Sequence, residues 1–295
     1  MNDAEFVAFL QWALPRVGLR WEGFRKVRRR VERRLARRMR ALRLPDWTAY
    51  RQRLEKDDSE WEVFDAACRL TISRFWRDHG VFDALARIVL PTLAELARAR
   101  GENRVRCWSA GCASGEEAYS VRLAWEAGAA ARFPGFALHV VGTDADPRVL
   151  TRARLACFLA GALRDLPSSW TDRAFERRGG LYCLRASLRS GFEFRCEDLR
   201  RRVAEGNFHL VLCRNVAFTY FGDALQRKLV LRIAERIPPG GALLLGAHER
   251  LPAPFAEFVP WPLAPGLLRR TSTAPLVAQG NCEAEDPMRE CGSDT

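Results

Sequence analysis

The fold of this chain is decided around residues 105–120, VRCWSAGCASGEEAYS. The stretch begins as an apolar run typical of a strand and ends in the first turns of a helix. Between the two, Gly111 and Gly115 allow the backbone to approach a ligand without a Cβ atom in the way. The turn lacks the GxGxxG and GK[ST] patterns of phosphate-binding loops. Because Glu116 and Glu117 would repel phosphate, the turn favours a ligand with cationic groups and hydroxyl donors.

Strand-like and helical patterns alternate beyond this turn. Apolar runs of strand length lie at 105–111, 138–144, 208–215 and 242–248, and helical spacing occurs at 116–131, 147–158 and 224–237. Strands that are apolar on both faces and alternate with helices predict an α/β fold with a doubly wound, mostly parallel sheet. Ligands of such sheets bind outside the carboxyl ends of the strands. Asp144 stands at one of those ends, where an acidic residue typically hydrogen-bonds ribose hydroxyls.

Other segments surround this α/β domain. We expect a basic helical domain over 1–70, a linker segment and helix over 71–103, the α/β domain over 104–271 and a disordered tail over 272–295. The segment LYCLRASLRSGFEFRCED (181–198) contains two strand-like runs around a polar turn, which predicts a small inserted β-hairpin at about 179–198. The tail is polar and aperiodic, as disordered segments are.

The positive charge of the chain is concentrated in one element. Between Arg20 and Arg43 there are twelve Arg or Lys residues and two acids, a net charge of +10 out of +12 for the chain. Apolar residues recur there at spacings of 3, 4, 4, 4 and 3, at Phe24, Val27, Val31, Leu35, Met39 and Leu42. The pattern predicts a helix of about 20 residues, with one packed face and a row of arginines on the others. Such a row favours a polyanionic partner.

The composition limits location and chemistry. The apolar runs are shorter than a membrane-spanning helix requires, and the acidic start MNDAE is unlike a signal peptide, so we expect a cytoplasmic protein. The nine cysteines form no CxxC pair and the four histidines lie far apart in the sequence, so we expect free, mostly buried thiols and no metal site.

Five motifs occur together in a recognisable order. They are TISRFWRD (71–78), WSAGCASGEEAYS (108–120), GTDADPRVLTRAR (142–154), LVLCRNVAFTYF (210–221) and GALLLGAHE (241–249). Together with the arginine-rich helix before them, they resemble the CheR family of chemotaxis-receptor methyltransferases over about residues 5–270. The resemblance implies a Rossmann-like class I methyltransferase that uses S-adenosylmethionine and releases S-adenosylhomocysteine. It also implies that glutamate side chains on the helical cytoplasmic domain of a receptor are methylated.

The resemblance and the turn together predict the site residues. The residues predicted to bind the cofactor are Thr71, Ser73, Arg77, Gly111, Glu117, Asp144, Asp198, Leu199, Arg214 and Asn215. The residues predicted to be catalytic are Arg77 and Tyr220. The residues predicted to contact the substrate are Arg30, Arg34 and Arg37. Thr71 and Asp198 stand where the family usually has asparagine, and Tyr220 is offset because its motif is one residue longer than usual.

Elementary chemistry agrees with a carboxylate as the methyl acceptor. A glutamate is already anionic at pH 7, so its methylation needs positioning rather than a general base. The planar guanidinium of Arg77 can orient a carboxylate, although without the motif a salt bridge between Arg77 and Asp78 is the simpler explanation.

Two other functions compete with this hypothesis. A nucleic-acid methyltransferase would use the basic helix on phosphates, but CRNVAF differs from the Asn/Asp-Pro-Pro-aromatic motif of base methylases. A receptor-docking module that binds the cofactor without turnover is the other alternative. We expect a monomer whose partner is an acidic helical receptor domain, with no nucleic acid and with membrane contact only through the receptor.

Overall fold

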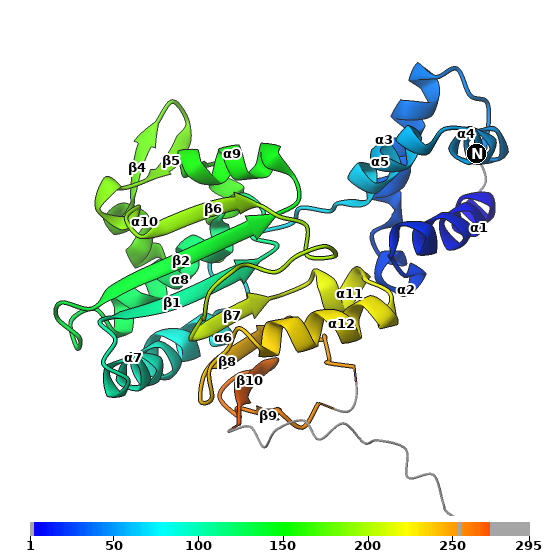
Figure 1. Cartoon of the computed structure of the whole chain (residues 1–295). Coiled ribbons are helices and arrows are strands. Elements are labelled where there is room, and N and C mark those ends of the chain that lie inside the picture. The colour runs from blue at the N-terminus through cyan, green and yellow to red at the C-terminus, as the bar shows by residue number, and fades with distance from the viewer. Residues whose placement is uncertain (1–2, 253–254, 272–295) are drawn as a thin grey trace, which may run out of the picture.

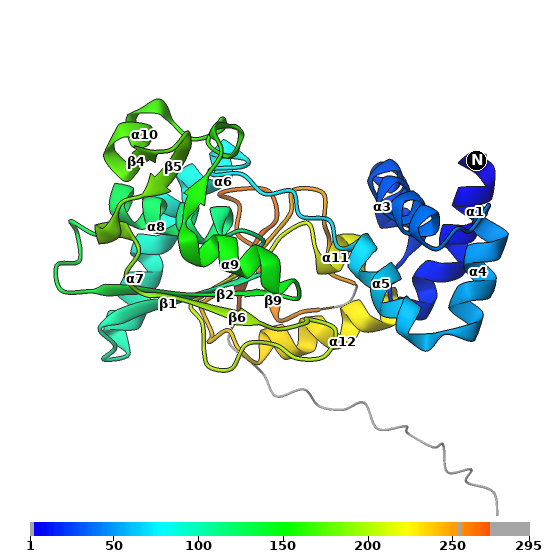
Figure 2. The same cartoon turned by 90° about the horizontal axis from the view of Figure 1, so that it is seen from above.

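The computed structural model describes residues 3–252 and 255–271, so the predicted disordered tail lies outside the described residues. Five α-helices form an N-terminal domain that lies beside the sheet-containing domain (Figures 1 and 2). They are α1 (Asp3–Ala13), α2 (Trp21–Phe24), α3 (Arg28–Ala41), α4 (Trp47–Lys56) and α5 (Asp58–Cys68), with a 3₁₀ turn at Leu14–Val17. Val31, Leu35 and Met39 of α3 are buried in the core of this domain, as their spacing predicts.

The prediction of a single basic helix of about 20 residues was wrong, because a break separates α2 from the 14-residue α3. The short α2 packs against α11 (Ala217–Tyr220) of the other domain. A Cβ atom at Gly23 would lie 2.3 Å from the carbonyl oxygen of Thr219, so only glycine permits this approach. The chain therefore turns after Phe24 to satisfy a tertiary contact that the apolar stripe does not reveal.

The second domain contains the predicted doubly wound sheet. Its strand order is β6-β2-β1-β7-β8-β10-β9, and the first five strands of that order run parallel. The strands are β1 (Arg104–Ala110), β2 (Ala137–Asp144), β6 (Phe192–Cys196), β7 (Leu210–Cys213), β8 (Ala242–Leu245), β9 (Phe258–Pro260) and β10 (Leu267–Arg270). Strand order reverses between β1 and β7, so the predicted ligand-binding edge lies after these two strands.

Helices cover both faces of the sheet. They are α6 (His79–Ala84), α7 (Leu90–Ala99), α8 (Glu116–Gly128), α9 (Pro147–Leu155) and α12 (Asp223–Ala234), and a wide π-helical turn at Leu85–Val89 joins α6 to α7. Leu210 and Leu212 of β7 share one buried cluster with α7 and α8, whereas Val211 shares the other with α12. This alternation explains why β7 is apolar at every position.

The inserted β-structure differs from its prediction. A three-stranded sheet is formed by β3 (Cys157–Phe158), β5 (Leu181–Leu184) and β4 (Phe175–Arg178), with α10 (Ser168–Ala174) before β4. The hairpin therefore pairs β4 with β5, and the proposed pairing of the two runs within 181–198 was wrong. The second run, β6, joins the main sheet parallel to β2, since Phe192 and Phe194 pack on Tyr119 of α8 there. Strand periodicity alone does not specify the pairing partner.

The cysteine prediction also needs correction. Cys157 and Cys183 are directly opposite each other on β3 and β5 and form a disulfide. Of the five free cysteines among the described residues, four are buried as expected and Cys196 is exposed. Opposed positions on two strands bring thiols together irrespective of their 26-residue separation, and sequence spacing gave no sign of it.

Within 3–252 and 255–271, no helix combines the length and hydrophobicity of a membrane span. In the same ranges, no group of three or more His, Cys, Asp or Glu side chains is arranged to hold a metal ion.

Candidate cofactor site at the domain junction

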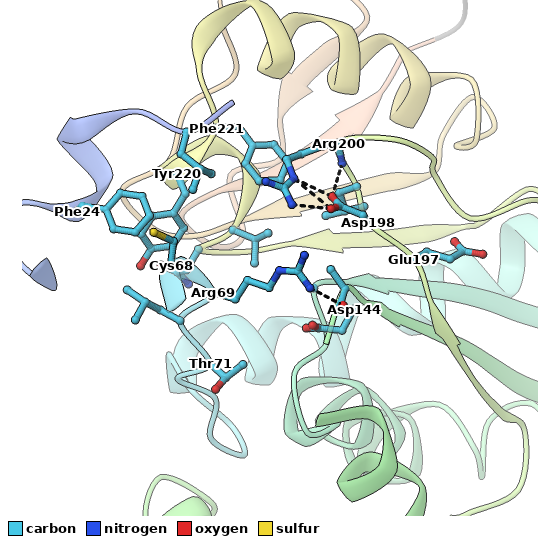
Figure 3. Close-up of a pocket in the computed structure, with 17 residues that line it drawn as sticks. Phe24, Cys68, Arg69, Thr71, Asp144, Glu197, Asp198, Arg200, Tyr220 and Phe221 are labelled. Atoms are coloured by element: carbon cyan, nitrogen blue, oxygen red, sulfur yellow. Dashed lines mark hydrogen bonds and ion pairs between the residues drawn. The ribbon is translucent and has the colours of Figure 1, made fainter. Parts of the chain in front are cut away.

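Two adjoining cavities lie where the N-terminal domain meets the carboxyl ends of β1, β2 and β7, and Figure 3 shows the first of them. Both are lined by Thr71, Gly111, Asp144 and Asn215. The first cavity continues toward residues of the N-terminal domain and of the loop after β6, and the second continues toward Arg77. All ten residues predicted to bind the cofactor line them, and so does Tyr220; the ten are Thr71, Ser73, Arg77, Gly111, Glu117, Asp144, Asp198, Leu199, Arg214 and Asn215.

The turn after β1 fixes Asp144 at the centre of the cavities. Gly111 adopts a φ of 78°, and its amide donates to the carbonyl of Thr143 at 2.8 Å. The amides of Ala113 and Asp146 each donate to a different carboxylate oxygen of Asp144, at 3.0 Å. Burial raises the pKa of Asp144, while these two amide hydrogen bonds oppose the rise. Each oxygen keeps a lone pair, which suits the acceptance of hydroxyl protons from a ribose.

Glu117 lies in the second cavity and is held from two sides. Its carboxylate accepts a hydrogen bond from the Ser109 hydroxyl at 2.7 Å and pairs with an Nη of Arg214 at 3.3 Å. Burial raises the pKa of Glu117, and the charge of Arg214 and the hydrogen bond from Ser109 oppose this rise. The other Nη of Arg214 forms an ion pair with Asp78, so Arg214 bridges α8 to the segment before α6.

The segment 71–78 brings Arg77 to the rim of the second cavity. Trp76 and Asp78 both have positive φ angles, 54° and 65°, which are uncommon for residues other than glycine. The guanidinium of Arg77 donates to the carbonyl of Ile72 at 3.2 Å. Among the described residues, Arg77 forms no ion pair with Asp78, because Asp78 pairs with Arg214 instead.

The loop after β6 closes the first cavity. Leu199 is buried on its wall, and Arg200 holds both carboxylate oxygens of Asp198. Burial raises the pKa of Asp198, but the hydrogen bonds and charge of Arg200 outweigh it and lower that pKa overall. Arg200 also binds both oxygens of Asp65 at 2.6 and 2.7 Å, which ties the loop to α5 of the N-terminal domain.

Arg69 completes this polar wall (Figure 3). It donates to Asp65 and, at 2.7 Å, to the carbonyl of Ala145, the residue after Asp144. Sequence analysis missed Arg69, Asp65 and Arg200, since partners as far as 135 positions apart have no local signature.

Asn215 and Glu249 shape the floor of the site. Asn215 has a φ of 55°, and its backbone amide donates to the carboxylate of Glu249 at 2.8 Å. Glu249 also accepts from the amide of Gly246 and the hydroxyl of Thr219, so one buried carboxylate joins the loops after β7 and β8. The motif GALLLGAHE contains Glu249, but its role became visible only through these contacts.

Tyr220 lines the first cavity from α11, with its ring 5.0 Å from that of Phe24. Burial raises the pKa of its hydroxyl, and the charges of Arg77 and Arg30 oppose that rise.

The three arginines predicted to contact the substrate are not equivalent. Arg30 and Arg37 are exposed on α3. Arg34 instead turns inward and donates to the carbonyls of Ala67 and Arg69, at the end of α5, at 3.0 and 2.6 Å. Arg34 therefore supports the start of the linker to the active-site segment.

The chemistry of the cavities matches one class of ligand. The first offers apolar side chains, Leu19, Leu199, Val216 and Phe221, for a flat ring. Asp144 follows as an acceptor for a ribose, and Glu117 offers a carboxylate toward an ammonium group. The fold and these hydrogen-bond acceptors fit S-adenosylmethionine, so the site is the one expected of a methyltransferase that uses this cofactor.

Comparison with known proteins gives the family. Residues 71–260 match the family described as "CheR methyltransferase, SAM binding domain", and residues 27–65 match "CheR methyltransferase, all-alpha domain". The chain belongs to the CheR methyltransferase family, and S-adenosylmethionine is its cofactor.

Relatives differ in how much of their length is shared. The chain is 32% identical over 267 residues to the chemotaxis protein methyltransferase of Salmonella typhimurium, covering 88% of each. It is 36% identical to chemotaxis protein methyltransferase 1 of Pseudomonas aeruginosa, covering 60% of this chain and 65% of that protein. An uncharacterized 104.1 kDa protein of Rhodobacter capsulatus is 33% identical over 75% of this chain, but the match spans only 23% of that larger protein.

Proposed function

We propose that this chain transfers a methyl group from S-adenosylmethionine to glutamate side-chain carboxylates of a chemoreceptor-like protein, which forms methyl esters. The observation that carries the proposal is the guanidinium of Arg77, unpaired within the described part of the chain. Arg77 lines the same cavity as Glu117 and Asp144, yet its guanidinium makes no ion pair with any described carboxylate. A guanidinium left available beside the cofactor site suits the capture of an incoming carboxylate.

The protein's share of the reaction is placement. S-adenosylmethionine supplies an electrophilic methyl group when it is bound. Arg77 would bind one face of the substrate carboxylate and direct a free oxygen toward the cavity. Since the carboxylate is ionised at neutral pH, no side chain has to remove a proton. Correct orientation of two reactants is worth several kcal/mol of the barrier.

The exposed face of α3 supports an acidic partner. Arg30 and Arg37 are exposed there, and α3 belongs to the domain that forms one wall of the first cavity. An acidic helical receptor domain that lies along α3 would gain complementary charge while one of its glutamates reaches Arg77. Relatives named chemotaxis protein methyltransferase make this partner class the natural choice.

The proposal is tested by Arg77→Ala with a purified receptor cytoplasmic domain and labelled S-adenosylmethionine. We expect the Kd for S-adenosylmethionine, measured by calorimetry, to change less than about twofold and kcat to fall about 100-fold, because only the acceptor loses its orientation. Arg132→Ala, at a half-exposed arginine outside both cavities, is the matched control.

Two results would reject the proposal. One is full transfer activity in Arg77→Ala. The other is a labelled product that survives mild alkali, since carboxyl methyl esters release methanol under these conditions whereas methylated bases and amines do not.

A further inference from the structure

The segment that carries Arg77 is attached to the inserted three-stranded sheet. Phe75 is fully buried, and its ring packs edge-on against Phe158 of β3 and Phe175 of β4, with centroids 4.8 and 5.1 Å apart. The amide of Phe75 donates to the carbonyl of Ala162 at 2.9 Å. Arg74 forms an ion pair with Asp165 at 3.1 Å. Four contacts from 158–175 thus hold two consecutive residues of the segment.

The main domain holds the next residue. The amide of Trp76 donates to the hydroxyl of Ser120, a fully buried residue of α8, at 2.9 Å. The buried Trp76 ring packs on Phe82, and its indole nitrogen donates to Asp83. These contacts maintain Trp76 at its positive φ, an uncommon conformation for a bulky residue. The backbone is therefore fixed on both sides immediately before Arg77.

We propose that the insertion, the three-stranded sheet with the connection from β3 to α10, is a positioning element for catalysis: by holding Phe75 and Arg74 it sets the direction in which Arg77 enters the cofactor cavity. The inference rests on the proposed role of Arg77. It gives the insertion a role in the chemical step, although β3, β4 and β5 contribute no residue to either cavity wall. Misplacement by about 1 Å is enough to slow an oriented reaction strongly.

The test uses two variants at positions outside the cavity walls, one of which releases Arg74, a residue that lines the second cavity. Asp165→Asn removes the charge that holds Arg74, and Phe75→Leu keeps an apolar side chain but loses the edge-on ring contacts. Neither residue lines a cavity. Glu176→Gln is the matched control, because it breaks ion pairs with Arg178 and Arg185 within the same insertion and does not touch the segment 71–78.

We expect kcat to fall about tenfold in Phe75→Leu and severalfold in Asp165→Asn, while the Kd for S-adenosylmethionine and the KM for the receptor domain change less than about twofold. Asp165→Glu should restore kcat, and Glu176→Gln should match the unmodified protein. If Phe75→Leu does not fold, Asp165→Asn with its Glu rescue still decides the question.

If Arg77→Ala inactivates the protein but kcat is unchanged in both Phe75→Leu and Asp165→Asn, this inference is overturned and the proposed function still stands. A parallel loss of kcat, cofactor binding and melting temperature would also overturn it, because that pattern reports general destabilisation. Full activity in Arg77→Ala would instead reject the proposed function.

Discussion

Two partly buried carboxylates, Asp144 and Glu117, face the cavities from neighbouring elements. Burial raises both pKa values, and each carboxylate is stabilised by donors that the fold supplies: amides for Asp144, and Ser109 and Arg214 for Glu117. An ionised carboxylate in a confined site binds hydroxyl and ammonium donors more strongly than a neutral one. Cofactor affinity is therefore linked to the protonation of these two groups.

This linkage predicts weaker cofactor binding in mild acid. Both pKa values are raised relative to a free carboxyl group, so protonation begins at a higher pH than for a free side chain. The Kd for S-adenosylmethionine, measured by calorimetry, should increase as the pH falls from 7.5 toward 5. Glu117→Gln should bind more weakly at pH 7.5 and show a shallower dependence. A Kd that stays constant over this range would contradict the assignment.

At the scale of elements, α3 has two kinds of arginine. Arg30 and Arg37 face solvent, whereas Arg34 satisfies carbonyl oxygens at the end of α5. We therefore expect Arg30 and Arg37 to contact the partner, whereas Arg34 stabilises the N-terminal domain.

The combined change Arg30→Glu and Arg37→Glu should raise the KM for a receptor domain in steady-state transfer assays, and added salt should reduce the difference from the unmodified protein. Arg34→Ala should instead lower the free energy of unfolding by about 1–3 kcal/mol, because two carbonyls lose a charged donor. An unchanged KM in the double variant would remove α3 from the partner surface.

The inserted sheet carries the disulfide between Cys157 and Cys183. Replacing both with serine should lower the free energy of unfolding by about 3 kcal/mol without reductant, since the unfolded chain regains the freedom of a loop of 26 residues. Dithiothreitol should lower the melting temperature of the unmodified protein but not of the double variant. Equal thiol titres before and after reduction would contradict the pairing.

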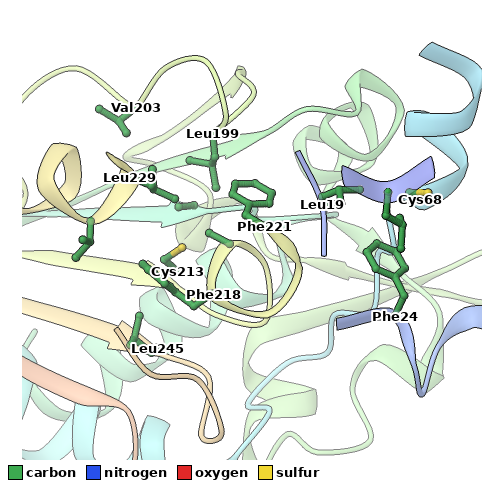
Figure 4. Close-up of a cluster of buried hydrophobic side chains, with 14 of the residues drawn as sticks. Leu19, Phe24, Cys68, Leu199, Val203, Cys213, Phe218, Phe221, Leu229 and Leu245 are labelled. Atoms are coloured by element: carbon green, nitrogen blue, oxygen red, sulfur yellow. The ribbon is translucent and has the colours of Figure 1, made fainter. Parts of the chain in front are cut away.

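At the scale of the whole molecule, the two domains share one hydrophobic core and one polar network. Leu19, Phe24 and Cys68 of the N-terminal domain lie in the same buried cluster as Leu199 and Phe221 (Figure 4). Beside this cluster, Asp65 forms ion pairs with Arg69 and Arg200, which both line the first cavity. The N-terminal domain is thus part of the cofactor site and also presents the basic helix.

Asp65→Asn should lower the free energy of unfolding by about 2 kcal/mol, less than for a fully buried pair because the arginines keep some solvent contact. It should also weaken cofactor binding severalfold, since Arg69 and Arg200 support the residues beside Asp144 and Asp198. Chemical denaturation and calorimetry measure the two effects, with Glu55→Gln in an exposed pair as the control. If neither quantity changes, the network does not join the domains.

The sequence by itself determined the features that depend on neighbours along the chain. Apolar periodicity predicted the helices that follow β1 and β2 and the parallel strands β1, β2, β7 and β8, and glycines after β1 predicted the ligand-binding turn. Asp144 follows from its place at a strand end, because parallel strands bring their carboxyl ends to one edge, whereas Asn215 was predicted from the family resemblance.

Tertiary structure alone decided which surfaces meet. It placed β6 beside β2, paired Cys157 with Cys183, turned Arg34 inward and joined Asp65 to Arg200. The physical reason is that strand pairing, disulfides and ion pairs depend on distances in space, and residues far apart in sequence leave no periodic signal of their contact.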